Sequence, residues 1–153
     1  MLIAIVIGAP FVPTNPATAK HMIELLQLKK GQKLYDLGSG DGRLLHLAAQ
    51  QGVHAVGIEM NLYAVIWATL MGYLKKSASH VSVKWGNYWN IPIKDADAVV
   101  IFGLPHLMPR FAQKFKAELR SGTKVVSNSF QIPGLKLVKH ETVGKDNIYL
   151  YTV

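Results

Sequence analysis

The chain of 153 residues contains no cysteine. Disulfide bonds and metal sites built on thiolates are therefore excluded, and this composition fits a reducing compartment. Half of the residues are hydrophobic and 17% are charged, so a chain of this length can bury a core without cross-links. We expect a single domain.

Acidic residues are also scarce. Nine Asp and Glu stand against 17 Lys and Arg, which gives a formal net charge of +8. A basic surface attracts nucleic acid, anionic lipid or an acidic protein, and charge alone does not choose among them. The positions of the few acids are more informative, because Asp36, Asp41 and Glu59 fall at the ends of predicted strands or in the loops that follow.

Long hydrophobic runs are absent as well. The N-terminal apolar run is far shorter than the roughly 20 residues of a spanning helix, and it lacks the positive residues that begin a signal peptide. Two interpretations stay open: a short buried strand or helix start, and the end of a membrane anchor whose earlier part is missing. We take residues 1–15 as an N-terminal apolar segment with a loop, and residues 16–153 as the domain.

Apolar periodicity and turn signals predict the elements of that domain. Helices are expected over residues 18–28, 43–51, 62–76 and 107–119, and strands over residues 33–37, 53–58, 81–85, 98–102, 123–127, 137–143 and 148–153. Alternating strands and helices predict a parallel sheet with helices on both faces, and the last two strands form a hairpin. The fold class is therefore α/β: a Rossmann-like, seven-stranded, mostly parallel sheet with a C-terminal antiparallel β-hairpin.

The most informative stretch is Asp36-Leu37-Gly38-Ser39-Gly40-Asp41-Gly42-Arg43, between a predicted strand and a predicted helix. Ligands of open α/β sheets bind at this edge, and glycines there let the backbone turn sharply and a ligand approach closely. Glu59 ends the next strand, where a carboxylate can accept hydrogen bonds from both hydroxyls of a ribose. The pattern predicts a site for a nucleoside cofactor.

Two kinds of nucleoside cofactor compete for this site. A dinucleotide fingerprint needs a third glycine where this chain has Arg43, and Asp36 and Asp41 would repel a pyrophosphate. S-adenosyl-L-methionine has no phosphate and carries an ammonium and a sulfonium, which acidic residues suit. A plain strand–turn–helix capped by Asp41 would not explain Asp36 together with Glu59, so we favour S-adenosyl-L-methionine.

These residues resemble those of class I S-adenosylmethionine-dependent methyltransferases. Three further stretches narrow the resemblance to the protein-lysine methyltransferases that modify the ATP synthase c-subunit and the adenine nucleotide translocase, with their prokaryotic relatives. They are Pro10-Phe11-Val12-Pro13-Thr14, Val99-Val100-Ile101-Phe102-Gly103-Leu104-Pro105 and Val125-Val126-Ser127-Asn128-Ser129-Phe130-Gln131-Ile132-Pro133-Gly134. The resemblance covers residues 10–153 and implies methyl transfer to a lysine side chain of a protein substrate.

The resemblance also implies roles for the matching residues. Those expected to bind the cofactor are Phe11, Val12, Pro13 and Thr14 over its methionine end, Asp36, Leu37, Gly38, Ser39, Gly40 and Asp41 along it, Glu59 at the ribose, and Met60, Asn61, Gly86, Asn87 and Tyr88 around the adenine. Those expected beside the transferred methyl, as the catalytic group, are Phe102, Gly103, Leu104 and Pro105. Relatives often carry Asp where this chain has Asn87. Core packing is the alternative for Phe11, Trp85 and Phe102.

Three functional interpretations remain at this point. The first is a protein-lysine methyltransferase. Its lysine acceptor must arrive as the neutral amine, and desolvation favours that form, so no strong base is needed. His106 fits a surface position better than the role of a proton acceptor. An RNA or small-molecule methyltransferase is the first alternative, and it rests on the net charge. A non-catalytic nucleoside- or nucleic-acid-binding module is the second. The Asn/Asp-Pro-Pro-aromatic motif of many base and glutamine methyltransferases is missing, and no histidine–carboxylate spacing predicts a metal.

One predicted helix, Leu62–Leu74, is apolar on every face. Such a helix is usually buried, yet one side of it should face away from the sheet. We expect it to contact a membrane surface or another subunit, unless the N-terminal segment covers it. The expected localisation is cytoplasmic, with the protein peripheral to or anchored at the inner membrane.

Overall fold

The computed structural model describes residues 12–153. Its helices are α2 (Pro16–Leu26), α3 (Arg43–Gln50), α4 (Leu62–Leu74) and α5 (Met108–Glu118), with a short 3₁₀ helix η1 (Pro105–Leu107) before α5. Its strands are β1 (Lys33–Leu37), β2 (His54–Glu59), β3 (Val81–Trp85), β4 (Ala98–Ile101), β5 (Lys124–Asn128), β6 (Lys136–Val143) and β7 (Asp146–Thr152).

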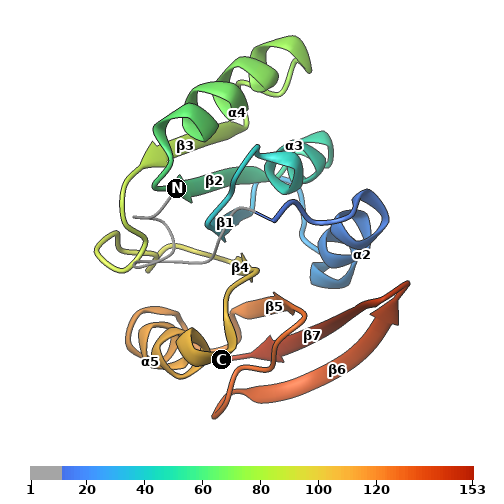
Figure 1. Cartoon of the computed structure of the whole chain (residues 1–153), viewed down its shortest axis with the longest axis vertical. Coiled ribbons are helices and arrows are strands. Elements are labelled where there is room, and N and C mark those ends of the chain that lie inside the picture. The colour runs from blue at the N-terminus through green and yellow to red at the C-terminus, as the bar shows by residue number, and fades with distance from the viewer. Residues whose placement is uncertain (1–11) are drawn as a thin grey trace.

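All seven strands join one sheet in the order β3-β2-β1-β4-β5-β7-β6 (Figure 1). The first five are parallel, β7 runs antiparallel to β5, and β6 pairs antiparallel with β7. The predicted fold class is confirmed. The hairpin turn is tighter than expected, because β7 already begins at Asp146.

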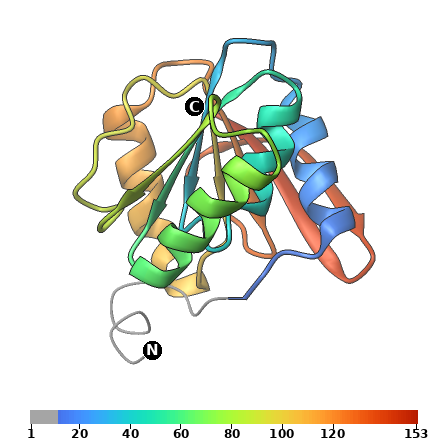
Figure 2. The same cartoon turned by 90° about the horizontal axis from the view of Figure 1, so that it is seen from above.

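Helices cover both faces of the sheet (Figure 2). The side chains of β1 alternate: Leu34 packs in the core under α2 and α3, whereas Tyr35 packs in the core under α5. Alternation of this kind is the period of a strand that is buried on both faces. The sheet therefore holds two apolar layers and fixes the strand ends between them.

Each of the four α-helices within residues 12–153 has at least one end that lies one or two residues from the predicted position, and α2 is shifted at both ends. Helix α2 begins at Pro16 because the side chain of Asn15 accepts a hydrogen bond from the amide of Ala17 and proline suits the first helical turn. It ends at Leu26 because Gln27 takes a left-handed conformation, with φ of 48°. The predicted helix over residues 107–119 is preceded by η1, so the chain turns earlier after β4.

Helix α4 lies along the β3 end of the sheet, beside α3 (Figure 1). Only Ala68 and Gly72 of its residues are buried, and Tyr63 is 83% exposed. Within residues 12–153 nothing covers its large apolar side chains, so this face is open. None of the helices in that range has the length and apolarity that crossing a bilayer requires.

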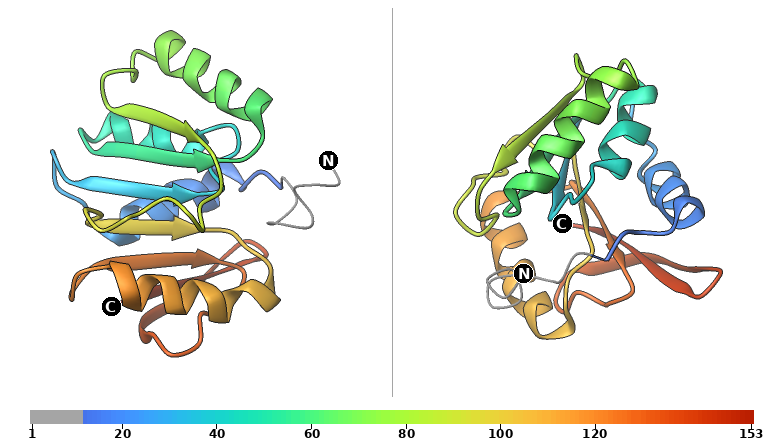
Figure 3. Two further views of the ribbon diagram at one scale, coloured as in Figure 1. Left: turned by 90° about the vertical axis from the view of Figure 1, so that its left-hand side faces the viewer. Right: turned by 45° about the horizontal axis from the view of Figure 1, so that its top comes forward.

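The parallel strands bring their carboxyl ends to one edge (Figure 3). The loops after β1, β2 and β4 meet there, and Val12–Thr14 crosses the same edge before α2. In doubly wound sheets this edge is where ligands bind.

Candidate cofactor and methyl-transfer site

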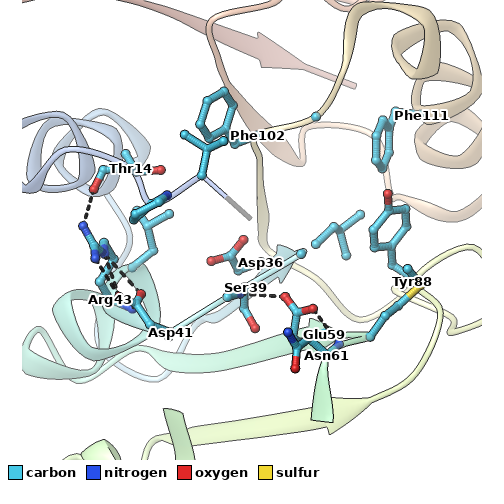
Figure 4. A pocket seen from close by; sticks show the side chains of 18 residues that line it. Thr14, Asp36, Ser39, Asp41, Arg43, Glu59, Asn61, Tyr88, Phe102 and Phe111 are labelled. Carbon is cyan, nitrogen blue, oxygen red and sulfur yellow. Dashed lines mark hydrogen bonds and ion pairs between the residues drawn. The ribbon is translucent and has the colours of Figure 1, made fainter. Parts of the chain in front are cut away.

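A pocket opens at this edge of the sheet (Figure 4). Its walls come from the segment before α2, the loops after β1, β2, β3 and β4, the start of α3, and helix α5. The lining residues are Val12, Pro13, Thr14, Asp36, Leu37, Gly38, Ser39, Gly40, Asp41, Arg43, Leu44, Glu59, Met60, Asn61, Tyr88, Phe102, Gly103 and Phe111.

The glycine-rich loop after β1 lies directly on β2. The amides of Gly38 and Ser39 both donate to the carbonyl of Ile58, at 2.8 and 3.2 Å. Gly38 has a φ of +87°, which a residue with a side chain rarely adopts. Gly57 has no room for a Cβ, which would lie 2.4 Å from the Ser39 hydroxyl oxygen. Two glycines therefore let the loop turn back over the neighbouring strand and leave its open side to a ligand.

Glu59 is fixed by backbone amides on both sides. Its Oε2 accepts from the amide of Gly40 at 2.8 Å, and its Oε1 accepts from the amide of Asn61 at 2.8 Å. Asn61 is itself fixed, because its side chain caps the start of α4. Each carboxylate oxygen has a further lone pair, so both can accept one more hydrogen bond from inside the pocket. This is the geometry that two vicinal ribose hydroxyls need.

Asp36 is the most unusual group of the pocket. It is only 4% exposed, and within residues 12–153 its carboxylate makes no hydrogen bond or ion pair. Burial raises the pKa of Asp36 to about 8, and the charges of Glu59 and Asp41 add to the shift. A cation beside Asp36 would offset this cost, whereas a phosphate would increase it. The buried Ser39 hydroxyl also lacks a partner among residues 12–153. Both observations fit S-adenosyl-L-methionine.

Asp41 lines the pocket, and its carboxylate also pairs with Arg43 at 2.6 Å. Burial acts to raise its pKa, but hydrogen bonds and the charge of Arg43 outweigh burial and hold the pKa below its usual value. Arg43 also donates to the carbonyl of Thr14 at 2.6 Å. Arg43 thus ties the segment before α2 to the glycine-rich loop, and the carboxylate of Asp41 serves that link.

Aromatic side chains form the opposite wall. The rings of Tyr88 and Phe111 pack at a tilt of 34°, with 5.4 Å between ring centroids, and Phe102 follows β4. Burial and the charge of Glu59 raise the pKa of Tyr88 to about 12, so its phenol stays neutral. This wall can hold an apolar or aromatic part of a ligand and exclude water from it.

Most of the residues predicted from the sequence come together here, and four of them do not line the pocket. Leu104 and Pro105 lead into η1, while Gly86 and Asn87 lie in the loop after β3. Asn87 uses its side-chain oxygen to accept from the amide of Trp89 at 2.9 Å, which stabilises that turn. The roles assigned to these four residues remain predictions, and Phe11 lies outside the described residues.

Three lining residues were not among the predicted site residues: Arg43, Leu44 and Phe111. Arg43 ends the glycine-rich stretch, so its place in the sequence could have indicated that it lines the pocket. Phe111 lies far along the chain on α5, and its sequence neighbourhood reads as an ordinary buried helix face. Within residues 12–153, no three His, Asp or Glu side chains gather closely enough to hold a metal ion.

The sheet order, the glycine-rich loop and the ribose-type carboxylate define a class: the methyltransferase domains of class I, which use S-adenosyl-L-methionine. Comparison with known proteins gives the family. The model of the family described as ANTKMT methyltransferase domain matches residues 36–139, and the chain belongs to this family.

Three relatives illustrate the similarity. The ATP synthase c-subunit lysine N-methyltransferase of Rattus norvegicus is 32% identical over 144 residues, 93% of this chain and 65% of the relative. Protein-lysine N-methyltransferase of Saccharolobus islandicus is 31% identical over 150 residues, 94% of this chain and 93% of the relative. The crystal structure of an RNA methyltransferase from Salinibacter ruber in complex with S-adenosyl-L-homocysteine has 29% identity and a TM-score of 0.89, covering 93% of this chain and 94% of that one.

The chain spans only part of several relatives. It covers 65% of the rat protein and 53% of the human protein of the same name. The family match and the sheet order assign the family and the fold of the part that this chain shares with them.

Proposed function

We propose that this protein is an S-adenosyl-L-methionine-dependent N-methyltransferase that methylates a lysine side chain of a protein substrate. The observation that carries the proposal is the presence of two different carboxylates in one pocket. Both oxygens of Glu59 are oriented by backbone amides, and Asp36 is buried without a partner among residues 12–153. The names of the rat and archaeal relatives support lysine as the acceptor.

The chain's own residues position the reactants. S-adenosyl-L-methionine, when bound, supplies the activated methyl group. Glu59 would accept the hydrogen bonds of the ribose hydroxyls, and Asp36 would balance the positive charge of the methionine end. Phe102 and Phe111 keep water from the reacting region. Such a site accelerates the reaction by orientation and desolvation, which also favour the neutral form of the attacking amine.

An RNA acceptor is the second candidate. It is supported by the net charge of +8 and by the name of the Salinibacter ruber protein. To separate the two, methyl-labelled S-adenosyl-L-methionine is supplied with membrane protein, soluble protein and RNA from the same cells. Label in a protein fraction supports the proposal, and label confined to RNA overturns it.

A non-catalytic nucleoside-binding module predicts a different result. Calorimetric titration of S-adenosyl-L-methionine should show binding that Glu59→Ala weakens strongly, and transfer of label should follow binding. Tight binding without transfer to any of the three fractions would favour the non-catalytic module.

The open face of α4 supports a further part of the proposal: peripheral contact with an anionic membrane surface, at the cytoplasmic side of the inner membrane. Tyr63 and Trp67 are exposed on this helix, and aromatic side chains of this kind favour the membrane–water interface. Lys75 and Lys76 follow the helix directly, and cations near a surface are attracted to anionic lipid.

Liposome flotation tests this contact. The protein should float with vesicles that contain phosphatidylglycerol and should float less with purely zwitterionic vesicles. Tyr63→Ser with Trp67→Ser should reduce flotation, while Lys29→Ser with Lys30→Ser, on the loop after α2, serves as the control. Flotation with neither vesicle would refute the contact, and a dimer in sedimentation would then assign the face to a second copy.

A further inference from the structure

A second hollow lies beside the cofactor pocket and shares a wall with it. The shared wall consists of Val12–Thr14 and Phe102. The remaining walls come from the start of α2, the end of β5 and the tip of the β6–β7 hairpin. We call this hollow the hairpin groove. A molecule in the hairpin groove would reach the cofactor pocket past Phe102, which follows β4 at the edge where the ligand site opens (Figure 4).

The hairpin groove contains a carboxylate in a fixed position. Asp146, the first residue of β7, accepts a hydrogen bond through Oδ2 from the Thr18 hydroxyl at 2.6 Å. Thr18 is buried in the first turn of α2, so this bond joins parts of the chain that are far apart in sequence. Among residues 12–153 no cation pairs with Asp146, and its Oδ1 accepts no hydrogen bond. The free oxygen is therefore available to a cationic or N–H-bearing ligand.

A buried amide faces the same hollow. Asn128 ends β5 and is only 1% exposed. Its Oδ1 accepts from the Ser129 hydroxyl at 2.8 Å. Ser129 has a φ of 72°, a left-handed conformation that is unfavourable for a residue with a side chain and that is typical of functional sites. Its amide donates to the carbonyl of Asn147 at 2.7 Å, which holds the end of β5 against the hairpin.

We propose that the hairpin groove is the acceptor site, and that Asp146 and Asn128 bind the side-chain amine of the incoming lysine. This inference rests on the proposed function and adds the residues that select the acceptor. Asp146 draws in the ammonium, and Phe102 contacts the apolar stem and its cationic end. Lys145 also lines the hairpin groove, so the preference for an amine rests on the free oxygen of Asp146.

The step that follows is balanced without a further reactant. The ammonium held by Asp146 loses one proton to water before its nitrogen attacks. The nitrogen lone pair then forms the N–C bond with the methyl carbon, while the C–S bond breaks and its electron pair stays on sulfur. Asp146 and Asn128 contact the acceptor nitrogen through their side-chain oxygens before the transfer, and neither residue forms a covalent bond.

Two measurements on the full chain test the inference. In the first, ¹⁵N-labelled protein saturated with S-adenosyl-L-homocysteine is titrated with n-butylammonium, a probe for the lysine side chain. Shifts should cluster at Asn128 and Gly144, and Asp146→Asn should raise the half-saturating concentration at least fivefold. Asp146→Asn keeps an acceptor for Thr18. Glu24→Gln, which removes an exposed carboxylate from α2, should behave as wild type.

The second measurement follows methyllysine formation at increasing concentrations of the labelled protein fraction. Asp146→Asn should need about tenfold more acceptor for half-maximal rate, with unchanged affinity for S-adenosyl-L-homocysteine. Unchanged acceptor dependence, shifts scattered away from the hairpin groove, or a matching loss of cofactor affinity would overturn the inference. Absence of methyllysine with wild type would refute the proposed function, and the butylammonium titration would still decide whether the hairpin groove binds amines.

Discussion

Replacing Asp36 with Asn should raise the free energy of unfolding of the cofactor-free protein and lower its affinity for S-adenosyl-L-methionine. Its pKa is raised from 3.8 to about 8 in the folded protein, first by burial and then by Glu59 and Asp41. An acid whose pKa is raised by folding binds more protons in the folded state than in the unfolded state. The free energy of unfolding should therefore fall as pH rises from about 4 to about 8.

The size of the effect follows from the shift. Each pKa unit is about 1.4 kcal/mol, so the shift of Asp36 from 3.8 to about 8 corresponds to roughly 6 kcal/mol as an upper bound, and relaxation of the pocket reduces it. Asp36→Asn keeps the shape and removes the charge. We expect the variant to be more stable than wild type by about 2–4 kcal/mol at pH 8 and by a clearly smaller margin at pH 5.

Urea unfolding of the cofactor-free protein at pH 5, 6.5 and 8 measures this difference. The same variant should lose affinity for S-adenosyl-L-methionine more than for S-adenosyl-L-homocysteine, which lacks the positive sulfur. Asp95→Asn is the matched control of opposite sign, because Lys33 and Tyr35 hold the pKa of Asp95 below its usual value. An Asp36→Asn variant that is less stable than wild type at pH 8, or equally stable at all three pH values, would refute the reasoning.

Three further predictions concern single contacts. Gly57→Ala should displace the glycine-rich loop, because the new Cβ would lie 2.4 Å from the Ser39 hydroxyl oxygen; it should cost about 1–3 kcal/mol in urea unfolding and lower cofactor affinity in calorimetry, and an unchanged affinity would contradict the packing described. Glu59→Gln should weaken S-adenosyl-L-homocysteine binding roughly 10- to 100-fold, because charge-assisted hydrogen bonds are the stronger ones; binding as tight as wild type would remove the ribose assignment. Tyr151→Phe should lower the free energy of unfolding by about 1–2 kcal/mol, since the buried amide of Ile132 donates to the Tyr151 hydroxyl at 2.8 Å; cofactor affinity serves as its control and should not change.

The sequence predicted the site best where the site residues lie close together along the chain. The strand, the glycine-rich loop and Asp36 are contiguous, and Glu59 ends the next strand, so their meeting follows from the parallel order of β1 and β2. The hydrogen bonds that orient Glu59 could not be read in advance. They depend on how the loop folds back over Gly57, which is a matter of packing between strands.

Contacts between distant segments were harder to foresee. The pairing of Thr18 with Asp146 joins α2 to the hairpin, and neither residue belongs to a recognisable motif. The ion pair between Arg43 and Asp41 was likewise not predicted from the sequence. The apolar pattern of α4 indicated an unusual helix, and only the structure shows that the large side chains on its outer face are uncovered within residues 12–153.

The most direct test of the account is the chemical identity of the product. Protein incubated with methyl-labelled S-adenosyl-L-methionine and this enzyme is hydrolysed to amino acids, and the labelled residue is identified by mass spectrometry. The account predicts methylated lysine from wild type and a strong reduction with Glu59→Ala. Label in any other residue or in nucleotides, or no transfer by a protein that binds the cofactor, would contradict it.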